Sequence, residues 1–159
     1  MKSNISISTD RLKLRPVSEV DAEFIYTLLN SEGWKKYIGD RNVNSPDEAR
    51  KYIQVRMLPQ LKSHGYGNYM LIRKEDNVKM GTCGLYDREG LEGVDLGYAL
   101  LEEFWHNGYA YEAASAISKQ GFEIYDLPKI CAITSKENTA SQRLLQKLHF
   151  EYTDEMCLP

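Results

Sequence analysis

The sequence predicts a single domain of mixed α/β fold. Several runs show the alternation or continuous apolar composition of strands, and about four show the apolar spacing of helices. The central strand candidates follow one another through short turns, which favours antiparallel pairing. A helix separates the last two long strand candidates, so that pair should run parallel. The 159 residues, with 42% hydrophobic content, suit one domain, residues 1–159, with a core of its own.

The N-terminal part predicts a strand followed by a helix. Residues 11–17 alternate charged and apolar side chains and contain Pro16, as a strand with one solvent-exposed face does. Ser18 offers an N-cap, with Asp21 three residues later in a weaker variant of the capping box. Apolar residues follow at helical spacing, so the helix should end near Asn30.

A loop and a second helix should come next. Residues 31–44 contain glycines, aromatics and mixed charges without a clear period, so we expect a loop with one helical turn near residues 34–38. The segment Ser-Pro-Asp-Glu at residues 45–48 combines an N-cap, a proline at the first helical position and a capping box. The helix should run to about Lys62, with an interruption near Pro59.

The middle of the chain predicts a hairpin that extends into a meander. Residues 68–73 and 78–86 are strand-like, and the polar residues 74–77 join them. After a turn at residues 87–90, the run at 94–101 should pair back on the preceding strand.

The C-terminal third predicts a crossover connection. A helix should occupy residues 109 to about 125, before Pro128 breaks it. Residues 129–135 read as a buried strand, and residues 137–141 open a last amphipathic helix. A final strand should start at Phe150. The strand before the long helix and the strand after it should therefore pair in parallel.

Composition and charge argue against several classes of protein. The formal net charge is −3, and the 20 basic and 23 acidic side chains are mixed along the chain, so we expect no nucleic-acid surface. No apolar run approaches the roughly 20 residues of a membrane span, so we expect no membrane partner. The N-terminus lacks the apolar region of a secretory signal, and we expect a cytoplasmic protein.

The cysteines predict neither a disulfide framework nor a metal site. Cys83, Cys131 and Cys157 are odd in number, lie far apart and form no Cys-x-x-Cys pair. We expect three reduced thiols. Two of them, Cys83 and Cys131, should behave as small apolar residues inside strands.

The most informative stretch is residues 94–114, where a strand passes through a short turn into an alanine-rich helix. The first N–H groups of a helix have no intrahelical partners, and the helix dipole favours anions there. Gly108 would let the main chain approach a bound group closely. Phosphate is the natural ligand of such a junction, and the alternative is an ordinary loop closed by glycine.

Several segments carry a family resemblance. Gly97-Tyr98 precedes Trp-His-Asn-Gly-Tyr-Ala-Tyr-Glu-Ala at residues 105–113. Asn-Thr-Ala-Ser at residues 138–141 leads into a leucine-rich helix that ends before Phe150, and residues 9–16 give the opening strand. In order and spacing these segments resemble the GNAT superfamily of acetyl-CoA-dependent N-acetyltransferases. They are most similar to its RimJ/RimL-type branch, which acetylates ribosomal-protein N-termini.

The resemblance implies the GNAT acyl-CoA N-acyltransferase fold. In this fold a mixed, mostly antiparallel sheet has parallel, splayed fourth and fifth strands and about four flanking helices. It also implies acetyl-CoA as co-substrate, without a metal, with the pyrophosphate on backbone N–H groups where the long helix begins. The coenzyme-binding positions that it implies are Tyr98, Ala99, Leu100, His106, Asn107, Gly108, Tyr109, Ala110 and Asn138.

The chain departs from the family pattern at the turn, before the last strand and at its C-terminus. His106 and Asn107 replace the usual glycine or basic residue of the turn, so phosphate binding should depend on the backbone. His149 replaces the usual glycine before the last strand. The chain also stops at Pro159, before the final strand that the family pairs with the one from Phe150. The acceptor side is then either incomplete or supplied by a partner, and both a monomer and a homodimer are open.

Acetyl transfer to an amine needs a neutral amine, donors for the developing oxyanion and a proton for the departing thiolate. Asp95 falls where the family often carries glutamate and could take the ammonium proton through a water, the alternative being a solvated strand carboxylate. Ser141 could protonate the thiolate, the alternative being a helix-start serine that serves its own backbone. The tyrosine that is more widespread in this role would fall at Leu145.

Backbone groups should complete the site. The oxyanion would meet the N–H of Tyr98 or Ala99, where Gly97 suggests a bulge that splays the strand from its neighbour. Asn138 would be both the N-cap of the last helix and a coenzyme contact. We expect direct transfer without an acyl-enzyme, because no cysteine or serine shows a nucleophile–base pattern.

The expected acceptor is a protein or peptide N-terminus. Its α-amine has an ordinary pKa of about 7.7–8.0, whereas a lysine amine at about 10.4 needs far more help to lose its proton. Trp34, Tyr37 and Tyr66 could line the acceptor pocket. The alternatives are a small amine, such as a polyamine or an aminoglycoside, and a catalytically silent acyl-CoA-binding module.

Overall fold

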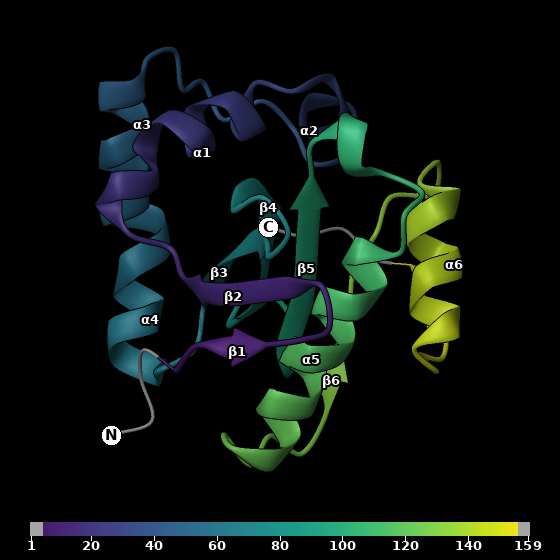
Figure 1. The fold of residues 1–159 in the computed structure, drawn as a ribbon. Coiled ribbons are helices and arrows are strands. Elements are labelled where there is room, and N and C mark those ends of the chain that lie inside the picture. Colours follow the sequence, from purple (N-terminus) through teal and green to yellow (C-terminus); the bar gives the residue numbers. More distant parts are fainter. Residues whose placement is uncertain (1–4, 156–159) are drawn as a thin grey trace.

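A six-stranded sheet organises the computed structural model, which describes residues 5–155 (Figure 1). The strands lie in chain order across the sheet, and neighbours are antiparallel except for the parallel pair β5 and β6. The mixed sheet with a parallel last pair is therefore confirmed. The strands are β1 (Ile7–Ser8), β2 (Leu12–Pro16), β3 (Asn68–Arg73), β4 (Val78–Tyr86), β5 (Val94–Leu100) and β6 (Ile130–Cys131).

Six α-helices and three shorter helical turns flank the sheet within residues 5–155. None of these helices is both long and apolar enough to cross a membrane. The helical turn expected near residues 34–38 is α2. The helices are η1 (Glu19–Asp21), α1 (Ala22–Leu29), α2 (Glu32–Tyr37), α3 (Pro46–Tyr52), η2 (Ile53–Met57), α4 (Leu58–His64), η3 (Glu102–Phe104), α5 (Tyr109–Glu123) and α6 (Thr139–Lys147).

The predicted second helix exists and is interrupted where the sequence indicated. It begins at Ser45, whose hydroxyl accepts the N–H of Glu48 at 3.1 Å. α3 then passes into the π-helical turn η2, and α4 follows. Pro59 has no N–H for a continuous α-helical ladder, which explains why the regular hydrogen-bond pattern breaks just before it.

Two apolar cores lie on the two faces of the sheet. Along β3, Tyr69 and Leu71 belong to the core under α5, whereas Met70 and Ile72 belong to the core under α1 and α3. This alternation is the period of two expected for a strand that is buried on both faces. Figure 1 shows α1, α3 and α4 gathered on one side of the molecule and α5 and α6 on the other. The two faces of the sheet are therefore covered by different sets of helices.

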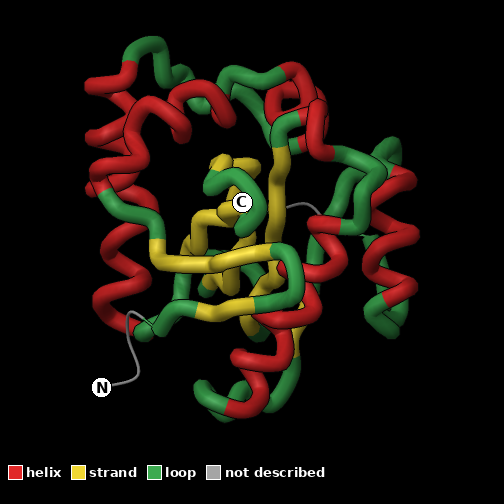
Figure 2. Tube along the Cα trace, in the orientation of Figure 1, coloured by secondary structure: helices red, strands yellow, loops and turns green. Residues whose placement is uncertain are grey.

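The sheet differs from the prediction at both ends. β1 was not predicted, because two residues are too few to show a period. β6 covers only two residues of the predicted strand at 129–135, and the strand predicted from Phe150 does not form through residue 155 (Figure 2). Instead, the N–H of Phe150 donates to the Leu145 carbonyl at 2.9 Å and that of His149 to Gln146. This is a Schellman cap, which His149 closes with a φ of 68°.

The bulge predicted at Gly97 is wrong. β4 and β5 pair without a register shift from Gly81–Leu100 to Tyr86–Asp95, and the irregularity of the sheet lies in β3, between Leu71 and Ile72. Glycine is required at position 97 for space, since a Cβ would come within 2.7 Å of the Tyr86 ring.

Both described cysteines are free thiols, as predicted. Cys83 is fully buried, and burial raises the pKa of its thiol to about 12. Cys131 is half-buried beside the backbone of β5. Cys157 lies outside the described residues.

A buried carboxylate joins β2, β4 and the start of the first helix. Asp21 is 0% exposed and lies 2.7 Å from both Arg15 Nη2 and Lys79 Nζ. Burial opposes its charge, but the hydrogen bonds from Arg15, Lys79 and the Ser18 N–H outweigh that effect and lower the pKa of Asp21 to about 2. The weak capping box predicted at this point is therefore part of a larger ionic cluster.

Acid should destabilise the fold through this cluster. Because the folded-state pKa of Asp21 is depressed, its contribution is present above the ordinary value near pH 4 and is lost as pH falls toward 2. Asp21→Asn should lower the free energy of unfolding at pH 7 by about 3 kcal/mol, because it leaves Arg15 and Lys79 unpaired. Urea unfolding at pH 7 and at pH 3 measures both effects. An unchanged pH dependence in the variant would contradict this account.

Candidate active site

β5 and β6 pair over two residues and then separate. Val94 lies opposite Ile130, and Asp95 lies opposite Cys131. From Leu96 onward, the edge of β5 that faces β6 has no strand partner among residues 5–155. The splay expected for the parallel pair is confirmed, and it opens the sheet beside the middle of β5.

The backbone of Tyr98 points toward this opening. The N–H of Leu101 donates to the carbonyl of Met80, its neighbour across the ladder, at 3.0 Å. Hydrogen-bonded and non-hydrogen-bonded pairs alternate in an antiparallel ladder, so Ala99 and Gly97 direct their N–H groups toward β4. Tyr98 directs its own N–H to the free edge. An oxyanion was expected to meet the N–H of Tyr98 or Ala99. Only the N–H of Tyr98 is available, because that of Ala99 points toward β4.

The turn expected to bind phosphate is an ordered loop that ends at the start of α5. His106 and Gly108 have φ angles of 65° and 80°. The first helical hydrogen bond runs from the Glu112 N–H to the Gly108 carbonyl at 3.1 Å. The N–H groups of residues 109–111 precede that bond and have no partner within the helix, which is the arrangement that anions favour.

Two side chains of the turn, Trp105 and Asn107, stabilise its backbone conformation. The indole Nε1 of Trp105 donates to the Leu100 carbonyl at 2.9 Å, which ties the loop to the end of β5. The amide of Asn107 donates to the Trp105 carbonyl at 2.9 Å. The predicted positions Leu100 and Asn107 therefore shape the loop through these bonds, and backbone N–H groups are what the turn offers a ligand.

Arg11 adds a cation at this turn that sequence reasoning missed. Its Nη1 donates to the Asn107 carbonyl at 2.9 Å, its Nε donates to Glu112 at 2.8 Å, and its guanidinium lies 4.3 Å from the centre of the Tyr109 ring. A Cβ at Gly108 would come within 3.3 Å of its Nη2. The only sequence signal for Arg11 was its place in the opening-strand motif. No local pattern could link it to the turn, because more than ninety residues separate the two.

The start of α5 fits a pyrophosphate. Free N–H groups, a left-handed glycine and a guanidinium that is also paired with Glu112 meet there, and such donors can bind phosphate oxygens without a metal. Within the described part of the chain, no group of three or more histidine, cysteine, aspartate or glutamate side chains could hold a metal ion.

Ser141 faces Tyr98 across the gap between α6 and β5. The two hydroxyl oxygens are 2.6 Å apart. The side chain of Asn138 accepts the N–H of Ser141 at 3.1 Å, so the N-cap role predicted for Asn138 is confirmed. The hydroxyl of Ser141 is directed to another element and does not serve the helix backbone alone. The structure thus brings together Tyr98, Asn138 and Ser141.

Asp95 is a buried carboxylate, which contradicts the alternative of a solvated one. Its exposed fraction is 2%, and Arg88 holds Oδ2 through Nε and Nη2 at 3.0 and 2.9 Å. Oδ1 is buried without a hydrogen-bond partner of good geometry among the described residues. Burial raises the pKa of Asp95, although Arg88 and the Ile133 backbone N–H oppose it. No sequence pattern indicated that Arg88 would bind this carboxylate.

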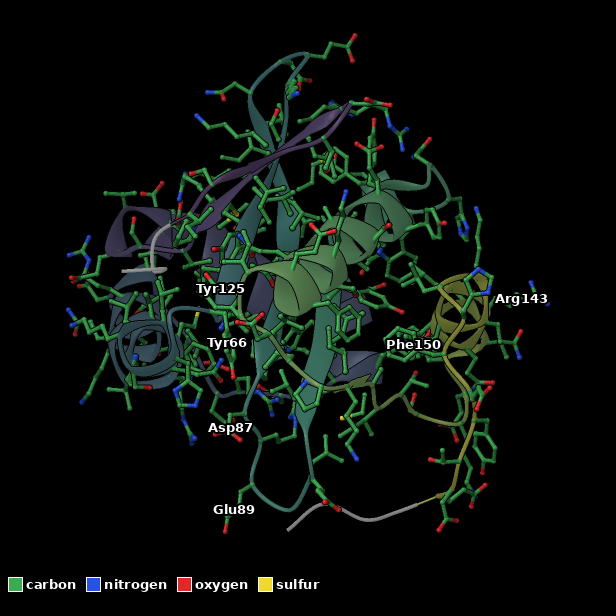
Figure 3. All side chains as sticks on the ribbon, turned by 90° about the horizontal axis from the view of Figure 1, so that it is seen from below. Tyr66, Asp87, Glu89, Tyr125, Arg143 and Phe150 are labelled. Carbon is green, nitrogen blue, oxygen red and sulfur yellow. The ribbon has the colours of Figure 1, made fainter. Side chains whose placement is uncertain are left out.

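The residues proposed for the acceptor pocket do not come together. Trp34 packs on the core under α1 and α3 from within α2, and Tyr37 ends that helix. Tyr66 instead stacks edge-on against Tyr125, with ring centres 5.1 Å apart (Figure 3). Because Tyr66 belongs to the core under α5, it lies on the other face of the sheet from Trp34.

A second polar group lies at the end of α4. Ser63 Oγ is 2.8 Å from His64 Nδ1, and His64 Nε2 is 3.0 Å from Asp87. The sequence did not show this nucleophile–base contact. A helix C-terminus presents carbonyl groups, which would repel an oxyanion, so the group lacks what acyl transfer requires. The expectation of direct transfer therefore stays a prediction.

Comparisons with known proteins agree with this geometry. The family profile of the acetyltransferase (GNAT) domain matches residues 11–151. Among relatives, the uncharacterised N-acetyltransferases p20 of Bacillus licheniformis and YoaA of Bacillus subtilis are 32% and 30% identical. They align over 92% and 91% of this chain and 82% of each relative. The spermidine N(1)-acetyltransferase of Escherichia coli is 23% identical over 94% of this chain and 77% of its own.

Solved structures share the fold. A GNAT-family acetyltransferase from Bacillus anthracis superposes with a TM-score of 0.74 at 25% identity, over 91% of this chain and 82% of that one. RimL, a ribosomal-protein α-N-acetyltransferase solved with coenzyme A, superposes with a TM-score of 0.79 at 20% identity, over 92% and 84%. The profile, the relatives and the splayed sheet agree, so the chain belongs to the GNAT family and is an acetyl-CoA-dependent N-acetyltransferase.

Proposed function

We propose that the enzyme transfers the acetyl group of acetyl-CoA directly to the α-amine of a protein or peptide N-terminus. The observation that carries the proposal is Asp95, a buried carboxylate with one oxygen held by Arg88 and the other without a hydrogen bond of good geometry among residues 5–155. It lies on β5 at the last residue before the sheet opens. A desolvated carboxylate oxygen at that point is suited to take a proton from an ammonium group, directly or through a water.

The acid–base properties of Asp95 favour a weakly basic acceptor. Burial raises the pKa of its carboxyl, which makes the carboxylate a stronger base than an ordinary aspartate. An α-ammonium with a pKa of about 8 is more than two pKa units easier to deprotonate than a lysine ammonium at about 10.4. An N-terminal α-amine therefore matches this base better than a lysine side chain does.

The two faces of β5 divide the chemistry. Side chains alternate along a strand, so Asp95 faces the side of α1 and α3, whereas Tyr98 packs with the core on the side of α5 and α6. When bound, acetyl-CoA supplies the acetyl thioester. Ser141, on the α6 side, would protonate the departing thiolate, while Asp95 receives the amine proton from the opposite face. The backbone N–H of Tyr98 would stabilise the oxyanion.

A small amine is the second candidate acceptor. The E. coli relative is named as a spermidine N(1)-acetyltransferase and matches over 94% of this chain, whereas RimL shares the fold at 20% identity. Against it, the guanidinium of Arg88 stands beside the proposed base, and this cation would repel a polycation such as spermidine.

Thiol release from acetyl-CoA in the presence of different acceptors tests the proposal. The panel contains peptides with free or blocked N-termini, spermidine and an aminoglycoside. Turnover with free-terminus peptides alone supports it. Preference for spermidine or the aminoglycoside would move the assignment to small amines. Coenzyme A binding without turnover of any acceptor would indicate a silent acyl-CoA-binding module.

Gly108→Ala should weaken coenzyme A binding about tenfold. The left-handed backbone at this position disfavours a Cβ by roughly 1–2 kcal/mol, and the new methyl group would press on the Arg11 guanidinium. Isothermal titration calorimetry with coenzyme A measures the effect. Gly90→Ala is the matched control, because Gly90 also has a positive φ, of 84°, but lies in the β4–β5 loop. Equal losses in both variants would argue against binding at the turn.

Asp95→Asn should lower kcat about 100-fold and leave the dissociation constant of coenzyme A unchanged, because an amide cannot accept the ammonium proton. The wild-type rate should fall as pH decreases through the raised pKa of Asp95, since the base form is the active one. Asp76→Asn is the control, because it breaks another aspartate–arginine pair, with Arg73, on the surface. A rate loss of similar size in both variants would contradict the assignment.

A further inference from the structure

Tyr98 reaches from β5 to α6 and contacts Ser141 with its side chain. Its hydroxyl lies 2.6 Å from Ser141 Oγ and 3.3 Å from the Ser141 carbonyl oxygen. The ring is half-buried and packs on the core under α5, as do Leu144, Leu145 and Leu148 of α6. The contact therefore joins two elements that pack on the same core.

Either hydroxyl can donate in this contact, and acidity favours one of the two directions. A phenol is a stronger acid than an alkyl alcohol, so the tyrosine is the better donor and the serine oxygen the better acceptor. Burial raises the pKa of Tyr98, although the bond to Ser141 opposes it, so the phenol stays protonated at neutral pH. When Tyr98 donates its hydrogen bond to Ser141 Oγ, the hydroxyl proton of Ser141 can point toward another acceptor.

The N-cap restricts Ser141 further. Its N–H is bound to the Asn138 side chain at 3.1 Å, which fixes the backbone at the first turn of α6. A serine here could turn its hydroxyl back to the helix, as serines at helix starts often do. The contact with Tyr98 holds Oγ toward β5 instead, the strand that borders the opening of the sheet.

We propose that the Tyr98 hydroxyl is a positioning residue that makes Ser141 the proton donor to the departing sulfur. This role rests on the proposed function. As the C–S bond of the thioester breaks, its electron pair goes to sulfur, and sulfur takes the Ser141 hydroxyl proton. Ser141 recovers a proton from Tyr98, and water reprotonates Tyr98. Tyr98 thus contributes twice, with its N–H to the oxyanion and with its hydroxyl to Ser141.

A double-mutant cycle with Tyr98→Phe and Ser141→Ala tests this role, with the free-terminus peptide as acceptor. Tyr98→Phe should lower kcat about tenfold, the loss that one hydrogen bond accounts for, while the dissociation constant of coenzyme A changes less than twofold. The double variant should be no slower than Ser141→Ala. The defect of Tyr98→Phe should largely disappear with acetyl-seleno-CoA, whose selenolate leaves without a proton.

The control is Tyr125→Phe, just after α5, because its hydroxyl also makes a hydrogen bond, to the Gly65 carbonyl at 2.7 Å, but lies outside the proposed site. It should behave as wild type. Multiplicative losses in the double variant, unchanged turnover in Tyr98→Phe, or an equal defect with the selenoester would each overturn the proposal while leaving the acetyltransferase function in place. A wild-type enzyme that binds coenzyme A but turns over no acceptor would instead overturn the proposed function, and this role with it.

Discussion

The short pairing of β5 with β6 is the constraint on which the site depends. Two residue pairs hold the strands together at Val94 and Asp95, and then they separate. A longer parallel ladder would have used the N–H and carbonyl groups of Tyr98 within the sheet. The sheet is therefore continuous where it supports Asp95 and open where Tyr98 offers its backbone. The two residues lie three positions apart on β5, so their side chains point to opposite faces of the sheet.

The opening has a different chemistry on each face. Buried Asp95 pairs with the partly exposed Arg88 on one side, and the hydroxyls of Tyr98 and Ser141 form a neutral pair on the other. Deprotonating an ammonium requires a base, and protonating a thiolate requires an acid, so the two pairs match the two ends of the proposed transfer. The sheet lies between them, so each pair can act on its own end of the transfer.

A second constraint fixes the start of α5. Glu112 accepts hydrogen bonds from the Thr9 hydroxyl at 2.5 Å and from both the backbone and the side chain of Arg11. Burial disfavours its charge, but these bonds prevail and lower the pKa of Glu112. The N-terminal segment is thereby tied to the first turn of the long helix, and the Arg11 guanidinium reaches the Asn107 carbonyl.

The sequence by itself determined most strands and helices, because period-two and helical patterns, caps and prolines act locally. It also predicted the parallel last pair and the N-cap at Asn138. Tertiary structure decided the rest: the clamp of Arg88 on Asp95, the reach of Arg11 and the contact of Tyr98 with Ser141. It also made Phe150 part of a helix cap, where the sequence predicted a strand. No local sequence pattern could predict these contacts, because only the packing of the folded chain brings their residues together.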